Sequence, residues 1–508
     1  MSVLPLLSVA AAQELPTLYR VNVPDHPDAL THSATGSVLS APPSDGTAFQ
    51  IESLAEIDAE PAVDAWGDVV AWEALDAMNI RPWHAAGHDG SGVKVAVFDV
   101  QWFGADLDEA ELGPVQTHDC FTHRSCQLPI DTLRPTFSFE RGAHGVACAE
   151  VIRDIAPGVE LHLVRLSGRT TLENAVRWAI DEEIDIIAMS LSFFNQSFYD
   201  GTGPVSRLMD TLADAGILMV TSAGNYADQH YRTDFKDDDR DGFHDFVLDE
   251  RGLPVELNRG RSQIYLSWDQ YGRCGDTDLD GFVTNAEGDV VGWSADPQDG
   301  DDDGCSPNER ISAHAETAGT HYLRVRHAGG VPAVRFDVHA RGAEIREPIT
   351  ENSITDPGAH PAVMTVGAVR ATAYLSAPAE AFSSEGDPEN RVLKPDVMGP
   401  NGLSSTVYGP TGFFGTSAST PAVAAAIALV MSADPSLSPT EAGARVVGWA
   451  ARPEAGTTWS APRITEIGRA RLPDPDQIGD GCMAFGGGRA ALLAPMVWLG
   501  WRRRRRVR

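Results

Sequence analysis

Short apolar runs alternate with helix-like segments in the first half of the chain. Val93–Phe98 is a run of β-branched and apolar residues, typical of a strand buried on both faces of a parallel sheet. Thr171–Glu183 repeats apolar side chains at helical spacing. Similar strand-like runs occur at Val159–Val164, Ile184–Met189 and Gly216–Thr221. This alternation predicts the α/β class, a three-layer sandwich with a central parallel sheet.

The pattern changes after Asn225. Residues from about 226 to 348 are acidic and rich in Gly, with short runs such as Ser262–Trp268 and His321–Arg326 that alternate apolar and polar positions. Such alternation is typical of antiparallel strands with one buried face. We therefore predict an inserted β-sandwich-like module over 226–348.

The α/β pattern returns near residue 349. Ala362–Gly367 is strand-like, and Pro421–Val430 is a strongly apolar helix. We expect Pro421 in the first turn of that helix, where its missing N–H costs no hydrogen bond. The α/β domain is therefore predicted to span 76–225 and 349–468, on either side of the insert.

The N-terminus has features of an export signal. Met1–Gln13 is apolar and ends in small residues, as before a signal-peptidase cut near Ala12, although it lacks basic residues. Residues 1–12 are thus predicted to be a signal peptide. Residues 13–75 are acidic and rich in Pro and Ala, and they fit either a short propeptide or an N-terminal extension.

The C-terminus is a separate element, 482–508, after a linker at 469–481. Met483–Trp501 is largely apolar and is followed by Arg502–Arg506. Its length suits one membrane span, with the arginines on the cytoplasmic side. A buried core helix is the alternative, and the arginine cluster argues against it.

Composition limits the class of protein. With 508 residues the chain should form more than one folded unit. Its net charge of −33 excludes a surface that binds nucleic acid by neutralising phosphates. A body this acidic suits a soluble protein that tolerates salt and binds cations.

Four of the six cysteines form two candidate pairs. Cys120 and Cys126 are close enough in sequence to close a small loop, and Cys274 and Cys305 flank one acidic segment. Both pairs fit disulfides in an oxidising compartment. His118 and His123 lie beside the first pair, so a zinc site is the alternative reading there.

Three polar residues occupy positions that suit acyl transfer. This chemistry needs a hydroxyl nucleophile, an imidazole base and a carboxylate that orients the base. Asp99 ends the strand Val93–Phe98, at the sheet edge where α/β proteins place their sites. His144 begins a helical run. Ser417 directly precedes the long apolar helix, whose N-terminus favours a developing oxyanion.

These motifs resemble those of the subtilisin-like serine proteases, the subtilases. Gly415-Thr-Ser-Ala-Ser-Thr-Pro421 is similar to the family's nucleophile signature, and the chain order Asp, His, Ser also matches. The resemblance covers about 76–225 and 349–455. It implies a peptidase with Asp99, His144 and Ser417 as its triad, acting on protein or peptide substrates.

The same resemblance implies further site residues. Asn225, in Ser222-Ala-Gly-Asn225, would donate its side-chain amide to the oxyanion. The residues implied to line the substrate are Ser190, Leu191, Ser192, Ser222, Ala223 and Gly224. No cofactor is required for such catalysis, and we expect a monomer.

The chain also departs from the family pattern. Val100 and Gln101 follow Asp99 where the family usually has Thr or Ser and then Gly, and Ala418 replaces the Met that usually follows the nucleophile. These changes motivate a second hypothesis, a surface binding protein on a degenerate protease fold.

Cys148 lies four residues after His144, so a helix would stack the two on one face. Cys148 is either a small buried hydrophobe or a free thiol behind the imidazole that makes the enzyme sensitive to mercury.

The insert contains a calcium-like spacing of carboxylates. Counted from Asp276, acidic residues fall at the first, third, fifth and twelfth positions of an EF-hand loop, which are Asp276, Asp278, Asp280 and Glu287. A second run, Asp237, Asp239 and Asp241, lacks the twelfth ligand. The alternative is that the first run opens a strand and that the residues after Glu287, Gly288-Asp-Val-Val291, form a hairpin turn. Structural calcium is predicted under the first reading.

The tail, Cys482 followed by an apolar run and an arginine cluster, resembles the C-terminal sorting tails of myxobacterial exported proteins. This resemblance implies passage across the inner membrane, processing near Cys482 and display at the cell surface. Cys482 as an unpaired thiol is the alternative. We therefore expect a secreted or surface protein that contacts the membrane through its tail before processing.

Overall fold

The structure is a computed structural model of the whole chain. It describes residues 18–22, 29–33, 37–44, 47, 49–51, 71–105, 109–131, 142–271, 277–298, 307–330, 333–386, 393–451 and 467–477. The signal peptide, the tail, Cys274, Cys305, Cys482 and Asp276 lie outside these ranges, so the predictions made on them stay predictions.

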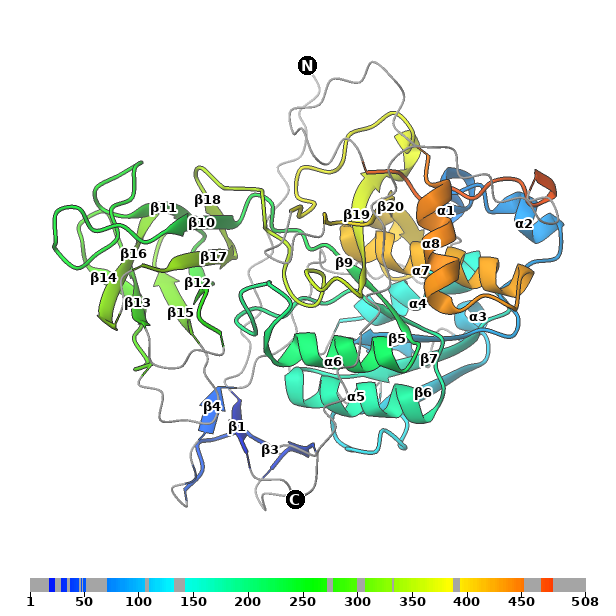
Figure 1. Cartoon of the computed structure of the whole chain (residues 1–508), viewed down its shortest axis with the longest axis horizontal. Coiled ribbons are helices and arrows are strands. Elements are labelled where there is room, and N and C mark those ends of the chain that lie inside the picture. Colours follow the sequence, from blue (N-terminus) through cyan, green and yellow to red (C-terminus); the bar gives the residue numbers. More distant parts are fainter. Residues whose placement is uncertain are drawn as a thin grey trace, which may run out of the picture.

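A seven-stranded sheet forms the centre of the larger unit (Figure 1). Its strand order is β20-β19-β9-β8-β5-β7-β6, and every pairing is parallel. The strands are β5 (Lys94–Asp99), β6 (Val115–Asp119), β7 (Glu160–Arg165), β8 (Ile186–Met189), β9 (Leu218–Ser222), β19 (Met364–Arg370) and β20 (Val397–Asn401). The four strand-like runs predicted before Asn225 and the one at 362–367 all fall on these strands.

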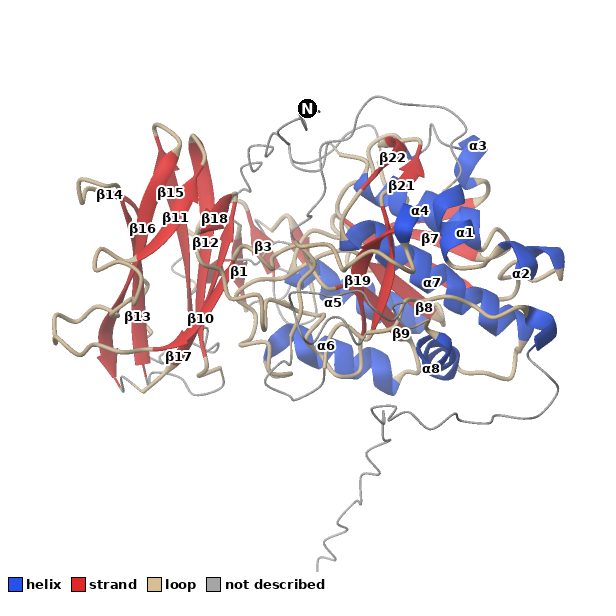
Figure 2. Cartoon of the chain, turned by 90° about the horizontal axis from the view of Figure 1, so that it is seen from above, coloured by secondary structure: helices blue, strands red, loops and turns tan. Residues whose placement is uncertain are grey.

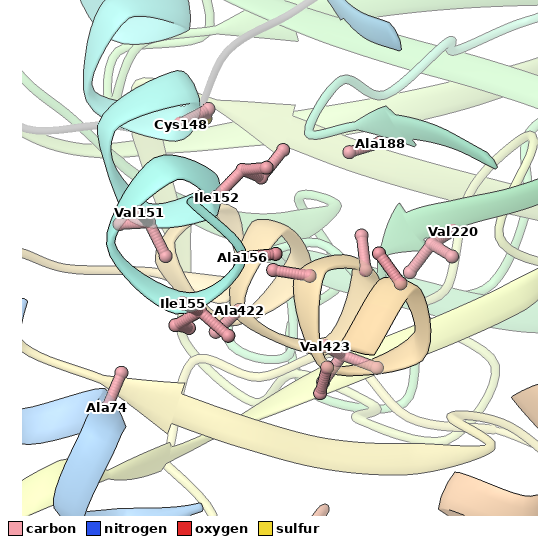
Figure 3. Close-up of a cluster of buried hydrophobic side chains, with 14 of the residues drawn as sticks. Ala74, Cys148, Val151, Ile152, Ile155, Ala156, Ala188, Val220, Ala422 and Val423 are labelled. Atoms are coloured by element: carbon pink, nitrogen blue, oxygen red, sulfur yellow. The ribbon is translucent and has the colours of Figure 1, made fainter. Parts of the chain in front are cut away.

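Helices cover both faces of the sheet. Apolar residues of α4 (His144–Ile155) and α7 (Thr416–Ala433) form one core with one face of the sheet. Figure 3 shows Val151, Ile152 and Ile155 of α4 beside Ala422 and Val423 of α7. On the other face, α5 (Arg169–Asp181) and α6 (Gly203–Asp214) pack into a second core. The predicted three-layer α/β class is confirmed.

Shorter elements complete this unit. They are α1 (Trp72–Ala77), α2 (Arg81–Ala85), α3 (Glu109–Leu112), α8 (Pro439–Trp449), the 3₁₀ turns η3 (Ala371–Ala373) and η5 (Pro475–Gln477), and the hairpin of β21 (Leu403–Ser405) and β22 (Gly409–Phe413). Among the described helices, α7 is long and apolar enough to span a membrane, and it is buried in the core.

The insert forms two antiparallel sheets that pack face to face at one end of the molecule (Figure 2). One sheet has the order β10-β17-β12-β15, with β10 (His230–Asp234), β17 (Arg335–Arg341), β12 (Gly260–Trp268) and β15 (Asn308–Ala315). The other has the order β14-β13-β16-β11-β18, with β14 (Val290–Ser294), β13 (Thr277–Thr284), β16 (Gly319–Gly330), β11 (Leu253–Leu257) and β18 (Ala343–Ile345). We call β10–β18 the module.

The module interrupts the connection between two neighbouring strands of the central sheet. Strand β9 precedes it and β19 follows it, and these strands pair with each other. The two ends of the module lie side by side, because Ile349 N donates to His230 O at 2.8 Å.

A small sheet near the N-terminus packs on the α5 side of the larger unit. Its strands are β1 (Tyr19–Val21), β2 (Thr31–His32), β3 (Ser37–Leu39) and β4 (Phe49–Ile51), in the order β2-β3-β1-β4. Leu18 and Val38 join the core of α5 and α6, and Arg20 forms an ion pair with Glu173 at 3.7 Å. The segment 13–75 therefore contributes a folded element to this face.

The expectation for Pro421 was wrong. Helix α7 begins at Thr416, so Pro421 lies inside the helix rather than in its first turn. Ser417 was expected directly before this helix, but it lies in the first turn, and Gly415 at the N-cap takes a positive φ of 99°.

Candidate active site

Asp99 and His144 form a fully buried pair. Asp99 is the last residue of β5, which has β7 on one side and β8 on the other. The direction in which successive strands are added to the sheet changes at β5, and α/β proteins place their sites at such a point. Asp99 Oδ2 lies 2.6 Å from His144 Nδ1, and both side chains are 0% exposed. The N–H groups of Val100 and Gln101 donate to Asp99 Oδ1 at 2.8 and 2.9 Å. The carboxylate is therefore held as an acceptor for the imidazole.

His144 begins α4, and its second nitrogen is directed away from the carboxylate. In the described residues, His144 Nε2 is buried and has no hydrogen-bond partner. The ring of Phe413 meets the imidazole edge-on, with centroids 5.8 Å apart. Since Asp99 is an acceptor, Nδ1 carries the proton and Nε2 has a free lone pair, as a general base requires.

Ser417 is the second residue of α7 and is 2% exposed. The N–H of Gly415, just before the helix, donates to Asn401 Oδ1 at 2.7 Å. The Asn401 amide in turn donates to Glu380 at 2.8 Å. These contacts fix the turn that presents the serine at the helix N-terminus, where free N–H groups favour an anion.

Pro421 changes the hydrogen bonding of the Ser417 backbone. Because proline has no N–H, the Ser417 carbonyl lacks its usual helical donor four residues later. The Ser190 hydroxyl donates to this carbonyl at 3.1 Å, and the Cys148 thiol approaches it at 3.8 Å. Sequence reasoning missed this role of Ser190, although a proline four residues after the serine was a signal for it.

Asn225 is oriented by Thr416. The Thr416 backbone N–H and its hydroxyl both donate to Asn225 Oδ1 at 3.0 Å. A backbone N–H can only donate, so the Asn225 side chain must present its oxygen to Thr416, which leaves its NH₂ group on the other side. The Gly224 N–H donates to the Thr416 hydroxyl at 3.2 Å. The nucleophile turn and the segment 222–225 are thereby joined.

The family model for the subtilase family, peptidase S8, matches residues 90–240 and 290–462, more than half of the chain. The chain belongs to the subtilase family. The CspB protease of Clostridium perfringens is a similar solved structure, with 16% identity, a TM-score of 0.53, and coverage of 79% of this chain and 96% of that chain. MycP1 without its propeptide covers 78% of this chain and 94% of its own, at 17% identity. Its TM-score is 0.39. At 16% identity the likeness to the CspB protease shows the fold alone.

The segment that this subtilase is expected to use for substrate pairing directly follows β8. Ser190, Leu191 and Ser192 are all buried, and so are Ser222, the last residue of β9, and Ala223 and Gly224 after it. Both groups lie at the carboxyl ends of neighbouring strands, on the same edge of the sheet as Asp99. The structure thus brings the predicted substrate residues to the edge of the sheet that carries Asp99.

Cys148 lies one helical turn after His144 in the subtilase. It is a free cysteine and is buried, and it has a ligand atom near those of Asp99 and His144. Burial, and secondly the Asp99 carboxylate, raise the pKa of the Cys148 thiol well above its usual value. The thiol is therefore neutral and packs behind the imidazole.

Cys120 and Cys126 form a disulfide, which joins residues six positions apart. The alternative of zinc at this pair was wrong, because oxidised sulfur atoms are not available as thiolate ligands. The Nδ1 atom of His118 instead faces the Cys126 carbonyl at 3.2 Å.

The EF-hand reading of the subtilase's insert was wrong in its geometry. Residues 277–284 form strand β13, and Asp280 forms an ion pair with Arg326 of β16. Glu287 is exposed in the turn before β14. The described carboxylates come together in two groups instead, Asp278 with Asp280 and Glu309, and Asp237 with Asp239 and Asp245. Glu309 is distant in sequence, and calcium binding to the module stays a prediction.

Proposed function

We propose that this subtilase is a serine endopeptidase that cleaves peptide bonds through an acyl-enzyme. The observation that carries the proposal is the buried Asp99–His144 pair, 2.6 Å apart, with Nε2 of the ring unpartnered in the described residues. Ser417 Oγ forms a bond to the peptide carbonyl carbon and passes its proton to His144 Nε2. The imidazolium then gives this proton to the leaving amine as the C–N bond breaks. Water repeats the two steps in reverse to release the acid.

Asn225 is proposed to stabilise the oxyanion together with the Ser417 backbone N–H. The support is its fixed side chain, whose NH₂ group faces away from Thr416. Removing one such donor typically costs about 10²–10³ in kcat, or about 3–4 kcal/mol. We expect Asn225→Ala to lose kcat by this factor while KM changes little.

Both reacting side chains are buried in this conformation. His144 is 0% exposed and Ser417 2% exposed. The small sheet β1–β4 of the segment 13–75 packs on the α5 side, on the opposite face of the central sheet from α4 and α7, so this packing does not place it over the site. The propeptide and extension hypotheses for 13–75 make different predictions: only a propeptide would be removed before activity develops.

A fluorophosphonate tests the nucleophile directly. Wild type, Ser417→Ala and the exposed control Ser436→Ala are labelled, before and after removal of residues upstream of about 76, and mapped by mass spectrometry. Labelling of wild type and Ser436→Ala at Ser417 alone supports the peptidase. If folded wild type is not labelled in either form, the second hypothesis, a surface binding protein, replaces it.

Export and surface sorting are proposed from the terminal residues alone. We expect deletion of Arg502–Arg506 to change the distribution of the protein between membrane and medium, as measured by cell fractionation. An unchanged distribution would contradict the sorting role.

We also propose that the module binds structural calcium. Titration calorimetry of the whole protein should give binding at millimolar calcium or below, and no heat of binding would exclude structural calcium.

A further inference from the structure

The module contacts the larger unit next to the predicted substrate-pairing edge. Residues 193–199, which directly follow that edge, are largely buried. The Phe194 ring stacks on Tyr265 of β12, with centroids 4.5 Å apart and an angle of 11° between planes. Asn195 Nδ2 donates to the backbone oxygen of Glu309 in β15 at 3.0 Å. The module therefore covers the continuation of the edge.

A buried ion cluster lies beside these rings. Asp337 of β17 is 0% exposed, and its Oδ2 accepts from Arg232 Nε at 2.7 Å. The same oxygen faces His230 Nε2 at 2.9 Å, and Asp337 Oδ1 faces His339 Nδ1 at 2.9 Å. The Arg232 guanidinium also covers the ring of Phe198, 4.5 Å from its centroid. Because Arg232 supplies the positive charge at this carboxylate, a metal ion is not needed to balance it.

The two histidines connect the cluster to the chain that leaves the module. His230 Nδ1 lies 2.5 Å from Ile349 O, and His339 Nε2 lies 3.3 Å from Ser353 O. The His339 ring also contacts the ring of Tyr199, with centroids 5.6 Å apart. The cluster thus touches both the segment 193–199 and the returning chain.

Residues 193–199 continue from the predicted edge Ser190–Ser192, and this edge contacts the nucleophile turn, because Ser190 Oγ donates to Ser417 O at 3.1 Å. We propose that the module positions extended peptide substrates, because its Arg232–Asp337 pair and Tyr265 ring hold the edge on which they pair. This inference rests on the proposed peptidase function and adds to it a positioning role for the module.

Substrates of two lengths should respond differently to a loosened module. A peptide with four residues on the acyl side of the scissile bond pairs along Ser190–Ser192 and depends on the position of that edge. A single-residue ester or a fluorophosphonate reaches only Ser417 and its immediate neighbours. A general loss of structure would affect both classes equally.

The test uses the full-length protein with Tyr265→Ala, Tyr265→Phe and Asp337→Asn. Asp249→Asn is the matched control, since Asp249 forms an exposed ion pair with Arg251 on the same module. For Tyr265→Ala and Asp337→Asn we expect KM for a tetrapeptide amide to rise at least tenfold. The rate of fluorophosphonate labelling and kcat/KM for a single-residue ester should stay within twofold. Tyr265→Phe, which keeps the ring, should restore the tetrapeptide KM.

Equal losses on both substrates, or no loss on either, would overturn the inference. If Asp337→Asn does not fold, the two Tyr265 variants decide the question. Hydrogen exchange gives a readout that does not need activity: the Phe193 N–H, which donates to Asp356 O at 2.9 Å, should exchange faster in Tyr265→Ala. If the Phe193 N–H exchanges faster in Tyr265→Ala but wild type cannot be labelled by the fluorophosphonate, the peptidase proposal fails while the contact between the module and the edge stands. Unchanged exchange would refute the positioning role.

Discussion

Asp356 should make the protein less stable as the pH rises, and Asp356→Asn should remove this effect. The carboxyl is 1% exposed, and its Oδ2 accepts the Ser197 hydroxyl at 2.7 Å. Burial, with a smaller contribution from Asp200, raises the pKa of Asp356 from 3.8 to about 7. In the unfolded chain the group ionises near its usual value, so unfolding between pH 4 and pH 7 releases a proton.

The sign and size follow from this difference. Below about pH 4 both states are protonated and the group has no effect on the free energy of unfolding. As the pH rises toward 7, that free energy falls by about 1.4 kcal/mol per pH unit, to a total of about 4 kcal/mol. Asparagine cannot ionise, and its side-chain oxygen can still accept from Ser197. The variant should therefore gain about 4 kcal/mol over wild type between pH 4 and pH 8.

Urea unfolding followed by tryptophan fluorescence at pH 4, 5, 6, 7 and 8 measures this gain. Both proteins carry Ser417→Ala, which prevents self-digestion. Asp249→Asn serves as the control, because that exposed carboxylate has its pKa lowered to about 2, chiefly by its hydrogen bond with Arg251. The control should follow the wild-type pH dependence over this range. Parallel curves for wild type and Asp356→Asn would refute the assignment of a buried neutral carboxyl.

Three further changes test the site and its supports. Gly145→Ala should lower kcat/KM at least tenfold, because a Cβ there would lie 2.8 Å from the Asp99 Cβ and 2.9 Å from the Trp102 ring; unchanged peptide hydrolysis would contradict the tight fit. A mercurial should leave wild type and Cys148→Ser equally active in a hydrolysis assay, because the thiol is buried and its pKa is raised well above its usual value; inhibition of wild type alone would show that the thiol is reached. Cys120→Ser should lower the free energy of unfolding by about 2 kcal/mol, since the disulfide closes a short loop; a thermal melt identical to wild type would show that the loop entropy is not released.

The strands and the positions of Asp99 and the turn before α7 were predictable from sequence for a physical reason. A parallel strand buried on both faces must be apolar along its whole length, so Val93–Phe98 is visible as a run and Asp99 marks its end. The nucleophile turn is local as well, because Gly415 is required where φ is 99°. Such features depend on neighbours in the chain, and a single sequence contains them.

The features that sequence reasoning missed depend on partners far along the chain. Asp280 has the spacing of a calcium ligand, but its partner is Arg326, 46 positions away on the next strand of the sheet. The start of α7 was misplaced because the apolar pattern begins only at Pro421, whereas the helix begins with polar residues that the site requires. The Arg232–Asp337 pair is separated by 105 positions, and no local pattern indicates it.

The adjacent ends of the module have a consequence for the order of folding. Strands β9 and β19 pair across about 140 intervening residues, and closing so long a loop is entropically unfavourable. Once the module has folded, the His230–Ile349 contact reduces the effective loop to about 25 residues, which lowers the closure cost by about 1.5 kcal/mol. Strands β19 and β20 should therefore join the central sheet most readily after the module has formed. The module is then expected to fold before the sheet that it interrupts is complete.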